Sequence, residues 1–565
     1  MNRTQIRRFI RYLRYTLFGI LLFTTSLHAQ EMTPPLDIPL FLSGNFGELR
    51  SNHFHSGLDF KTQGVRGIPV KSVKDGFISR ISISPYGYGN ALYINHSDGT
   101  TSVYGHLERF APAIETLARD SQYQQETFAV NLHFLSGRLP VKKGELIAWS
   151  GNTGSSGGPH LHFELRETKS EKIIDPLPYF KNKILDTRPP EIRGIMLFPQ
   201  PGKGIVNGNA FNQPIALTKD KTGRQNVART ITAWGAIGVG IKAYDRMNGV
   251  ANIYGVNEII LKVEGEEVYH SVMNRFSFDD TRYLNSCIDW KEWTENNSFY
   301  VKSFTDPGNR FGVNRASTNG IIHITEEKIY HLEYILKDVY GNKTTLKFNI
   351  TGSKAPVPFN RQGDVYFPFN KENQFAGKGI DLKIPLQNLY TDIYLKIDTF
   401  TGYTSFAPLY SIGDRLPLHA YCALTLDITK DIHPCKSKYG VVQIIKNKKE
   451  WLGGQYKEGK ITVQTRELGK FAVETDTIPP VITPVNKQKW TQNRRITFKI
   501  SDDLSGISSY RGTLNGNFIL FEYDAKNHLL YYVYDAKRMK KEYGALHLVV
   551  IDKAGNQSEF SATLD

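Results

Sequence analysis

The sequence predicts a mainly β protein made of several domains. At 565 residues the chain is longer than one hydrophobic core usually holds. Aromatic residues make up 12% of it, with 30 Tyr and 32 Phe, which favours β-rich globular structure over disorder. Short alternating segments separated by glycine turns recur without the strand–helix rhythm of parallel α/β folds. We therefore expect an antiparallel β-sheet domain followed by several β-sandwich domains.

Residues 1–29 are expected to be a signal peptide. Five arginines precede the apolar run Leu17 to Leu27, and Leu27-His28-Ala29 places a small residue before a cut at Gln30. No cysteine follows the run, so we expect no lipoprotein anchor. An uncleaved anchor is the alternative, although the run is short for a membrane span. No later segment is long and apolar enough to span a bilayer, which leaves the periplasm or cell envelope, or secretion, as the expected location.

The net charge and the cysteines argue against two classes of function, nucleic-acid binding and metal binding by thiolates. The formal net charge is +15, and removal of the five signal-peptide arginines leaves +10 (15 − 5). That excess is spread along the chain, so we expect no nucleic-acid partner. The three cysteines form no CxxC motif, which argues against a thiolate metal site. Cys422 and Cys435, thirteen residues apart, could pair in an oxidising compartment.

The first region, residues 30–180, reads as short antiparallel strands. Asp75-Gly76 and Asp98-Gly99 are typical of tight turns between strands. Strands are expected at 68–73, 77–83, 91–95, 101–107, 141–149 and 160–165. Extra sequence at 111–140 interrupts them and contains a short predicted helix from Ile114.

Two histidine motifs in this region carry potential metal donors. The glycine-rich stretch 151–158, in which Gly154, Gly157 and Gly158 can take backbone angles closed to other residues, leads into His160-Leu-His162. Strand alternation puts His160 and His162 on one face, roughly 6–7 Å apart. Upstream, Gly57 allows a bend that brings His55 and Asp59 to one point. Imidazole and carboxylate are ordinary zinc donors, although each motif alone also occurs as surface histidines or as a hydrogen-bonded turn.

The motifs in this order resemble the lysostaphin-type M23 peptidoglycan endopeptidases. His55-x3-Asp59, Tyr104-Gly-His106-Leu and His160-Leu-His162 carry the resemblance, together with the Asp75-Gly76 turn and the segment Val141-Lys-Lys-Gly-Glu-Leu-Ile. It covers about residues 40–170. It implies one zinc ion held by His55, Asp59 and His162, with His106 and His160 flanking the metal-bound water. Spacing alone leaves open whether His160 or His162 is the ligand.

The sequence departs from the simple family core in the insertion at 111–140, which could rim or cover the groove. His133 lies within this insertion and His96 follows a strand, and we interpret both as structural. His53 receives the same interpretation but is the main rival ligand.

A repeat organises the rest of the chain. Asp186-Thr-Arg-Pro-Pro matches Asp476-Thr-Ile-Pro-Pro, and the segment at 243–250 resembles 501–507. Asp338-Val-Tyr-Gly-Asn342 matches Asp552-Lys-Ala-Gly-Asn556. The order is the same in both copies, so we expect two β-sandwich modules at 186–354 and 476–565 that resemble bacterial immunoglobulin-like modules. The first copy is longer, with inserted sequence around 276–315.

Three acidic residues of the repeat, Asp245, Asp502 and Asp503, have two interpretations. They could bind calcium, but the sequence lacks the dense Asp-x-Asp-x-Asp pattern of a calcium-binding loop. The pattern therefore favours capping of turns.

Residues 355–475 form a third, different β-rich region, with expected strands at 380–384, 393–397 and 440–445. It contains no catalytic motif. We expect the regions after 185 to act as a spacer or to dock the enzyme to the wall or to a cell-envelope protein.

The functional expectation is hydrolysis of amide bonds in peptidoglycan stem or crosslink peptides by metal-activated water. One alternative is a catalytically quiet scaffold or amidase activator that binds cell-wall peptides. Another is a secreted peptidase for glycine-rich proteins.

Overall fold

The computed structural model describes residues 32–564 except 222, 224, 360, 362, 405 and 540–542. The predicted signal peptide at 1–29 lies outside the described residues. Within the described part of the chain, no helix has both the length and the apolar character needed to cross a membrane. The structure is mainly β, as predicted.

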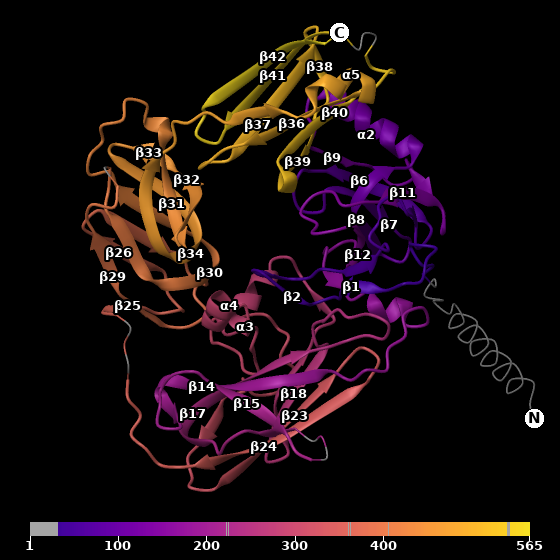
Figure 1. The fold of residues 1–565 in the computed structure, drawn as a ribbon. Helices are drawn as coiled ribbons and strands as arrows, with labels where there is room; N and C mark the ends of the chain where they lie inside the picture. The colour runs from indigo at the N-terminus through magenta and orange to yellow at the C-terminus, as the bar shows by residue number, and fades with distance from the viewer. Residues whose placement is uncertain are drawn as a thin grey trace, which may run out of the picture.

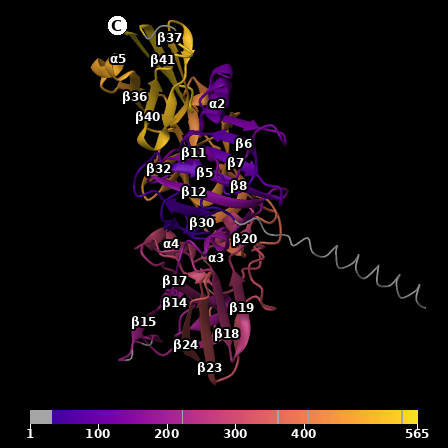
Figure 2. The ribbon, with the colours of Figure 1, turned by 90° about the vertical axis from the view of Figure 1, so that its right-hand side faces the viewer.

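The four regions follow one another around a ring (Figure 1). The second region, 186–354, packs below the first in this view, and the fourth, 476–565, returns to the first beside helix α2 (Pro112–Gln124). Turning the molecule shows the same order, with the fourth region above the first and the second below it (Figure 2). The first region therefore touches both the second region and the end of the chain.

An antiparallel sheet with the central order β1-β4-β12-β8-β7-β6-β10 forms the first region. Strand β12 pairs with β4 on one side and β8 on the other, and Asp59 of β4 lies directly opposite His162 of β12. Directly opposed residues in an antiparallel pair face the same side of the sheet. The elements are β1 (Leu42–Gly44), β2 (Leu49–Arg50), β3 (His53–Phe54), β4 (Leu58–Lys61), β5 (Pro69–Lys71), β6 (Gly76–Ile83), β7 (Asn90–Asn95), β8 (Thr100–Phe110), α2, β9 (Val130–His133), β10 (Pro140–Val141), β11 (Leu146–Ser150), β12 (His160–Glu167), β13 (Ile173–Ile174) and η1 (Leu177–Phe180).

The two predicted turns have different outcomes. Asp98-Gly99 joins the paired strands β7 and β8, with Gly99 at φ +81°, so it is a hairpin turn. Asp75-Gly76 does not close a hairpin, because β5 pairs with β11 while β6 pairs with β7. Gly76 is needed for a different reason: a Cβ there would collide with the backbone oxygen of Asn95.

The helix predicted in the 111–140 insertion is confirmed as α2, and it serves as a docking surface for the fourth region. Tyr123 packs edge-on against Phe518, with ring centroids 5.7 Å apart. Arg119 binds Glu522 at 2.5 Å, and Arg538 pairs with Asp120. The insertion therefore meets the end of the chain.

Strands of the second region link into one ten-stranded sheet through a parallel contact between β17 and β24. Part of its insertion at 276–315 joins the core of the first region, where Phe276, Leu284 and Phe311 are buried, while β21 within it pairs with β17. The elements are β14 (Glu191–Val206), β15 (Gln213–Lys219), β16 (Gln225–Val227), β17 (Thr232–Tyr244), β18 (Glu258–Val263), β19 (Glu266–Val272), β20 (Arg275–Phe276), η2 (Thr281–Tyr283), α3 (Leu284–Cys287), α4 (Trp290–Asn296), β21 (Val301–Lys302), β22 (Ile322–Ile324), β23 (Ile329–Lys337) and β24 (Lys343–Gly352).

The third region has an eight-stranded sheet around the long strands β30 and β34. Cys422 is buried on β30 and Cys435 is exposed, and both are free thiols, so the structure does not contain the disulfide considered from the sequence. The elements are β25 (Val365–Phe367), β26 (Asn373–Gly377), β27 (Ile380–Ile384), β28 (Ile393–Leu395), β29 (Ile397–Phe400), β30 (Leu409–Asp427), η3 (Lys436–Lys438), β31 (Tyr439–Ile445), β32 (Lys448–Gly453), β33 (Gln455–Lys457) and β34 (Lys460–Thr475).

Two four-stranded sheets, β35-β36-β40-β39 and β38-β37-β41-β42, make up the fourth region. Phe498, Phe521 and Leu548 belong to its buried core. The elements are β35 (Val481–Pro484), η4 (Lys487–Lys489), α5 (Trp490–Asn493), β36 (Arg495–Ser501), β37 (Ile507–Leu514), β38 (Asn517–Ile519), β39 (Glu522–Asp524), η5 (Ala525–Asn527), β40 (Leu529–Val533), β41 (Gly544–Asp552) and β42 (Gln557–Leu564).

Candidate metal centre

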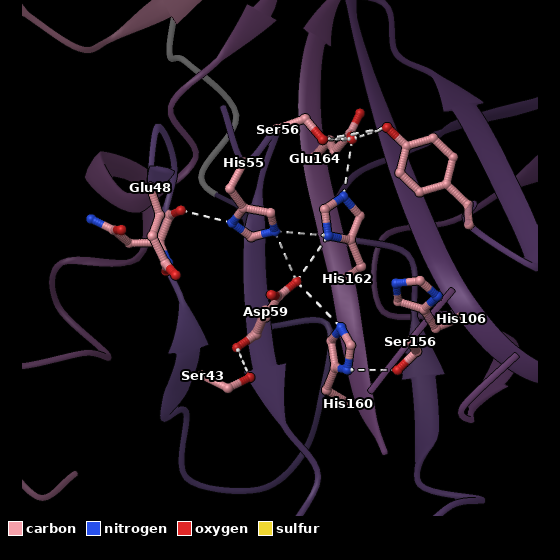
Figure 3. Close-up of polar contacts among 12 residues, drawn as sticks. Ser43, Glu48, His55, Ser56, Asp59, His106, Ser156, His160, His162 and Glu164 are labelled. Atoms are coloured by element: carbon pink, nitrogen blue, oxygen red, sulfur yellow. Dashed lines mark hydrogen bonds and ion pairs between the residues drawn. The ribbon is translucent and has the colours of Figure 1, made fainter. Parts of the chain in front are cut away.

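Two imidazole nitrogens and one carboxylate oxygen meet at one point on the first sheet. His55 Nε2 lies 3.0 Å from Asp59 Oδ1 and 3.2 Å from His162 Nδ1, and His162 Nδ1 lies 2.9 Å from the same oxygen. All three residues are buried, and Figure 3 shows them turned toward one another. Strand pairing places Asp59 opposite His162, while His55 arrives from the bend before β4.

The outward nitrogen of each imidazole is already occupied. His55 Nδ1 donates to the backbone oxygen of Asn45 at 2.7 Å. His162 Nε2 donates to Glu164 Oε1 at 3.0 Å. The other nitrogens, His55 Nε2 and His162 Nδ1, face the shared point. An imidazole whose outer N–H donates to an oxygen while its second nitrogen faces the site is typical of metal-binding histidines.

Glu164 is a functional residue that the sequence reasoning missed. Its carboxylate is fully buried and accepts hydrogen bonds from the hydroxyls of Ser56 and Tyr88, both at 2.5 Å. Arg166 binds its other oxygen at 2.6 Å. The signal available in the sequence was the alternation, which puts Glu164 on the same face as His160 and His162.

Both carboxylates at the site, Asp59 and Glu164, are ionised in spite of their burial. Burial works against ionisation of Asp59, but the neighbouring His55, His160 and His162 hold its pKa well below the usual value. Burial likewise opposes charge on Glu164, yet Arg166 and His162 lower its pKa to about 2. For His162, burial favours the neutral form, while hydrogen bonds to Asp59 and Glu164 outweigh it and raise the pKa to about 9. Two carboxylates thus attract positive charge to this point.

His106 and His160 lie beside the donor cluster, with ring centroids 4.7 Å apart (Figure 3). His106 Nδ1 donates to the backbone oxygen of Thr153 at 2.8 Å, and His160 Nδ1 donates to that of Gly158 at 2.8 Å. His106 Nε2 is therefore left as a proton acceptor, whereas His160 Nε2 lies 3.3 Å from Asp59 Oδ1. Burial, followed by the charges of His162 and His160, lowers the pKa of His106 to about 3, so this imidazole is neutral at physiological pH.

The glycine-rich loop holds these two histidines through its backbone. Gly154 is left-handed at φ +68°, and a Cβ there would overlap the backbone of Gly87 and Gly89. Gly157 and Gly158, which the sequence grouped with it, have no positive φ and open space around their Cα atoms. Only Gly154 of the three therefore needs glycine for its conformation.

The other histidines of the first region lie elsewhere. His53, the rival ligand, is exposed and its Nδ1 contacts the backbone oxygen of Ser51. His96 is tied on both nitrogens, to the Asp75 backbone and to Ser102. His133 is exposed on β9 and contacts Asn131. The group of close donors contains His55, Asp59 and His162 and none of these three.

Comparison with known sequences places a peptidase domain at this site. Residues 53–121 match the sequence model of peptidase family M23, and residues 364–476 match that of the Zu5-like domain. The M23 match includes His55, Asp59 and His106 and ends before His160. The N-terminal part of the chain therefore contains a peptidase M23 domain.

The similar curated proteins match about a fifth of this chain. DD-carboxypeptidase/endopeptidase Mpg of Neisseria meningitidis serogroup B is 33% identical over 118 residues, which is 21% of each chain. Lysostaphin of Staphylococcus simulans is 30% identical over 131 residues, 23% of this chain and 22% of that protein. The match thus spans about a fifth of the length of these relatives.

Among solved structures, the catalytic domain of lysostaphin from Staphylococcus simulans is 28% identical. The alignment covers 25% of this chain and 92% of that one, with a TM-score of 0.19.

Proposed function

We propose that this chain is an exported, zinc-dependent endopeptidase that hydrolyses amide bonds in peptidoglycan peptides. The observation that carries the proposal is the convergence of His55 Nε2, His162 Nδ1 and Asp59 Oδ1 within 3.2 Å of one another. An M23 domain surrounds that point.

The donor set suits zinc better than the other common cations. Two imidazoles and one carboxylate are ordinary zinc ligands, whereas calcium and magnesium prefer oxygen alone. Three protein ligands leave a position free, which is typical of catalytic rather than structural sites. Bound there, zinc would polarise the scissile carbonyl and lower the pKa of a coordinated water.

His106 and His160 are the proposed acid–base residues. Both lie next to the donor cluster, and each is oriented by a hydrogen bond from Nδ1 to a backbone oxygen. Either imidazole can accept a proton from the attacking water and return it to the leaving amine. No serine or cysteine nucleophile is required, so the proposed reaction has no covalent intermediate.

The names of the relatives support the substrate class. They include a DD-carboxypeptidase/endopeptidase, a glycyl-glycine endopeptidase and a peptidoglycan DD-endopeptidase. A wall substrate requires export, which agrees with the signal peptide expected at 1–29. We place the protein in the periplasm or cell envelope.

Substitution of a ligand tests the proposal directly. We expect the purified chain to hold about one zinc ion and to cleave purified muropeptides until a chelator is added. His162→Ala should remove both the metal and the activity, because only two donors remain. His133→Ala, which changes an exposed histidine outside the cluster, is the matched control and should keep both.

Mass spectrometry of digested sacculi then identifies the bond that is cut. Full activity in His162→Ala would refute the ligand assignment. Binding of muropeptides without turnover, with or without added zinc, would make the protein a scaffold or amidase activator instead.

A further inference from the structure

Two clusters of three aspartates, all buried except the half-buried Asp502, occupy the same place in the two repeated regions. In each cluster, one carboxylate oxygen from every member lies within 4.8 Å of the others. The first member comes from the entry to the region, the second from the Asp that precedes a glycine turn, and the third from the Asp-x-x-Gly-Asn motif. The clusters are Asp186, Asp245 and Asp338 in the second region and Asp476, Asp502 and Asp552 in the fourth.

The surroundings repeat almost atom for atom. Asn342 binds Asp338 through its backbone nitrogen at 2.8 Å and its side-chain amide at 2.7 Å, and the same amide donates to the backbone oxygen of Asp186 at 3.3 Å. Asn556 makes the same three contacts, at 2.8 and 2.7 Å to Asp552 and 3.1 Å to the oxygen of Asp476. The asparagine thus locks the first and third members together in both copies.

Within the part of the chain that the structure describes, the aspartates of these clusters have no ion-pair partner. Among the described residues, none of the six aspartates forms an ion pair with Lys, Arg or His within 4.0 Å. Asp186 and Asp245 are 7% and 3% exposed, yet Oδ2 of the first and Oδ1 of the second have no hydrogen-bond partner. A buried polar oxygen without a partner is costly, and a buried unpaired charge is costlier still.

Hydrogen bonds satisfy both carboxylate oxygens of Asp338, Asp476 and Asp552, but turn capping satisfies only one oxygen of Asp502. Asp502 Oδ2 accepts hydrogen bonds from the backbone nitrogens of Leu504 and Gly506, at 3.2 and 2.7 Å, as the sequence pattern favours. Its Oδ1 is buried and has no partner. The counterpart Asp245 likewise keeps Oδ1 free. The free oxygens therefore need another explanation.

We propose that each cluster binds one divalent cation with a preference for oxygen ligands, namely calcium. Three carboxylates that face one point supply the hard donors that calcium prefers, and a cation there satisfies the free oxygens of Asp186, Asp245 and Asp502. The clusters contain no histidine or cysteine, so they differ in chemistry from the zinc centre.

The raised pKa values of two aspartates in the second region agree with a cluster that has no positive charge beside it. Burial, followed by the charges of Asp338 and Asp186, raises the pKa of Asp245 to about 8. Burial also raises the pKa of Asp186, and Asp338 adds to the effect.

The first of these sites adjoins the peptidase domain. Asp245 pairs through its backbone with Tyr254, with N···O distances of 2.9 and 3.0 Å. Tyr254 in turn donates its hydroxyl to the backbone oxygen of Leu42, at 2.8 Å. A cation at this cluster therefore stabilises the contact between the first and second regions. The cluster that contains Asp476 lies where the fourth region begins.

Calcium titration of the zinc-loaded full-length chain, followed by isothermal calorimetry, tests the proposal. We expect two calcium ions per chain. Asp245→Asn and Asp502→Asn should each reduce this to one, and the double variant to none, because asparagine keeps the shape but loses the charge. Asp503→Asn, which changes the exposed neighbour outside the cluster, is the matched control and should keep both ions.

Thermal melting provides the second readout. Calcium should raise the Tm of the wild type and of Asp503→Asn, and should raise it less in each cluster variant. The proposal is overturned if calcium produces no binding heat and both cluster variants melt higher than the wild type at every calcium concentration. That result would mean that the aspartates merely repel one another and cap turns. Both readouts are independent of peptidase activity, so they stand or fall separately from the proposed function.

Discussion

Glu164 fixes which nitrogen of His162 faces the donor cluster. It accepts a hydrogen bond from His162 Nε2, and Ser56, Tyr88 and Arg166 hold the carboxylate in place. Carboxylates of this kind orient a metal-binding imidazole and raise its basicity.

Replacement of Glu164 by glutamine should weaken zinc binding by about 10- to 100-fold, because the neutral amide no longer supports the imidazole. Competition with a chromogenic chelator measures the affinity. Glu167→Gln on the same strand is the control, since Glu167 lies away from the cluster and pairs with Arg275. Equal zinc affinities for the two variants would argue against an orienting role for Glu164.

Asp175 precedes η1, the last helical turn of the first region, and makes the free energy of unfolding depend on pH. Burial raises its pKa to about 7, although the Leu177 backbone nitrogen donates to it at 2.9 Å. The folded protein holds this proton between about pH 4 and pH 7 whereas the unfolded chain does not, so the free energy of unfolding falls as pH rises through that window.

Asp175→Asn should therefore melt higher than the wild type at pH 8 and equally at pH 4, with a gain of at most roughly 4 kcal/mol. Differential scanning fluorimetry across this pH range measures the difference. Asp279→Asn, at an exposed position, should follow the wild type. A gain that is the same at pH 4 and pH 8 would assign the effect to something other than proton uptake.

At the scale of elements, the segment that carries His55 is held from outside the peptidase domain. Asn45, whose backbone oxygen accepts from His55, binds Gly255 twice through its side chain, both times at 3.0 Å. Phe54 stacks on Phe311 of the 276–315 insertion, with centroids 5.1 Å apart. The second region thus supports one of the proposed zinc ligands.

Asn45→Ala should lower kcat/KM on muropeptides by about 10-fold, because the oxygen that orients His55 loses its anchor. Asn252→Ala is the control: its side chain donates to the Ser43 backbone at 3.2 Å across the same contact but does not reach His55. Comparable losses in both variants would point to a general loosening of the interface.

At the scale of the molecule, the ring arrangement lets the second and fourth regions both contact segments that hold residues of the site (Figure 1). The second region supports His55. The fourth region reaches the glycine-rich loop, where Lys526 contacts the backbone oxygen of Asn152, next to the residue that binds His106. A cleft of about 590 Å³ between the first and fourth regions is lined by Asn152 and Glu522.

Truncation separates this supporting role from the spacer role expected from the sequence. A chain that ends at residue 475 keeps the second region and should fold with a lower Tm, because the packing of α2 on Phe518 is lost. A chain that ends at 185 loses Phe276, Leu284 and Phe311 from the core of the first region and should aggregate. Soluble yield and melting curves measure both. Wild-type Tm and activity in the 185-residue fragment would contradict the supporting role, and normal localisation and cell-wall activity of that fragment would contradict the spacer role as well.

The sequence by itself determined the mainly β class, most strands of the first sheet, the helix of the insertion and the M23 resemblance. These follow from local patterns: alternation specifies strands such as β12, and Asp98-Gly99 specifies a hairpin turn. The same patterns misread Asp75-Gly76 as a hairpin, because pairing partners are chosen by the whole sheet.

Only the tertiary structure decided how the motifs meet. Register places Asp59 opposite His162, and burial collects Glu164, Tyr88 and Arg166 around the second ligand. The zinc ligand set and the immunoglobulin-like assignment of the two modules stay predictions. Consecutive aspartates of each cluster lie between 26 and 93 positions apart in the chain, so neither their convergence nor their unpartnered oxygens could be read from spacing. Contacts between residues far apart in the chain depend on how the hydrophobic cores pack, and local sequence patterns do not specify that packing.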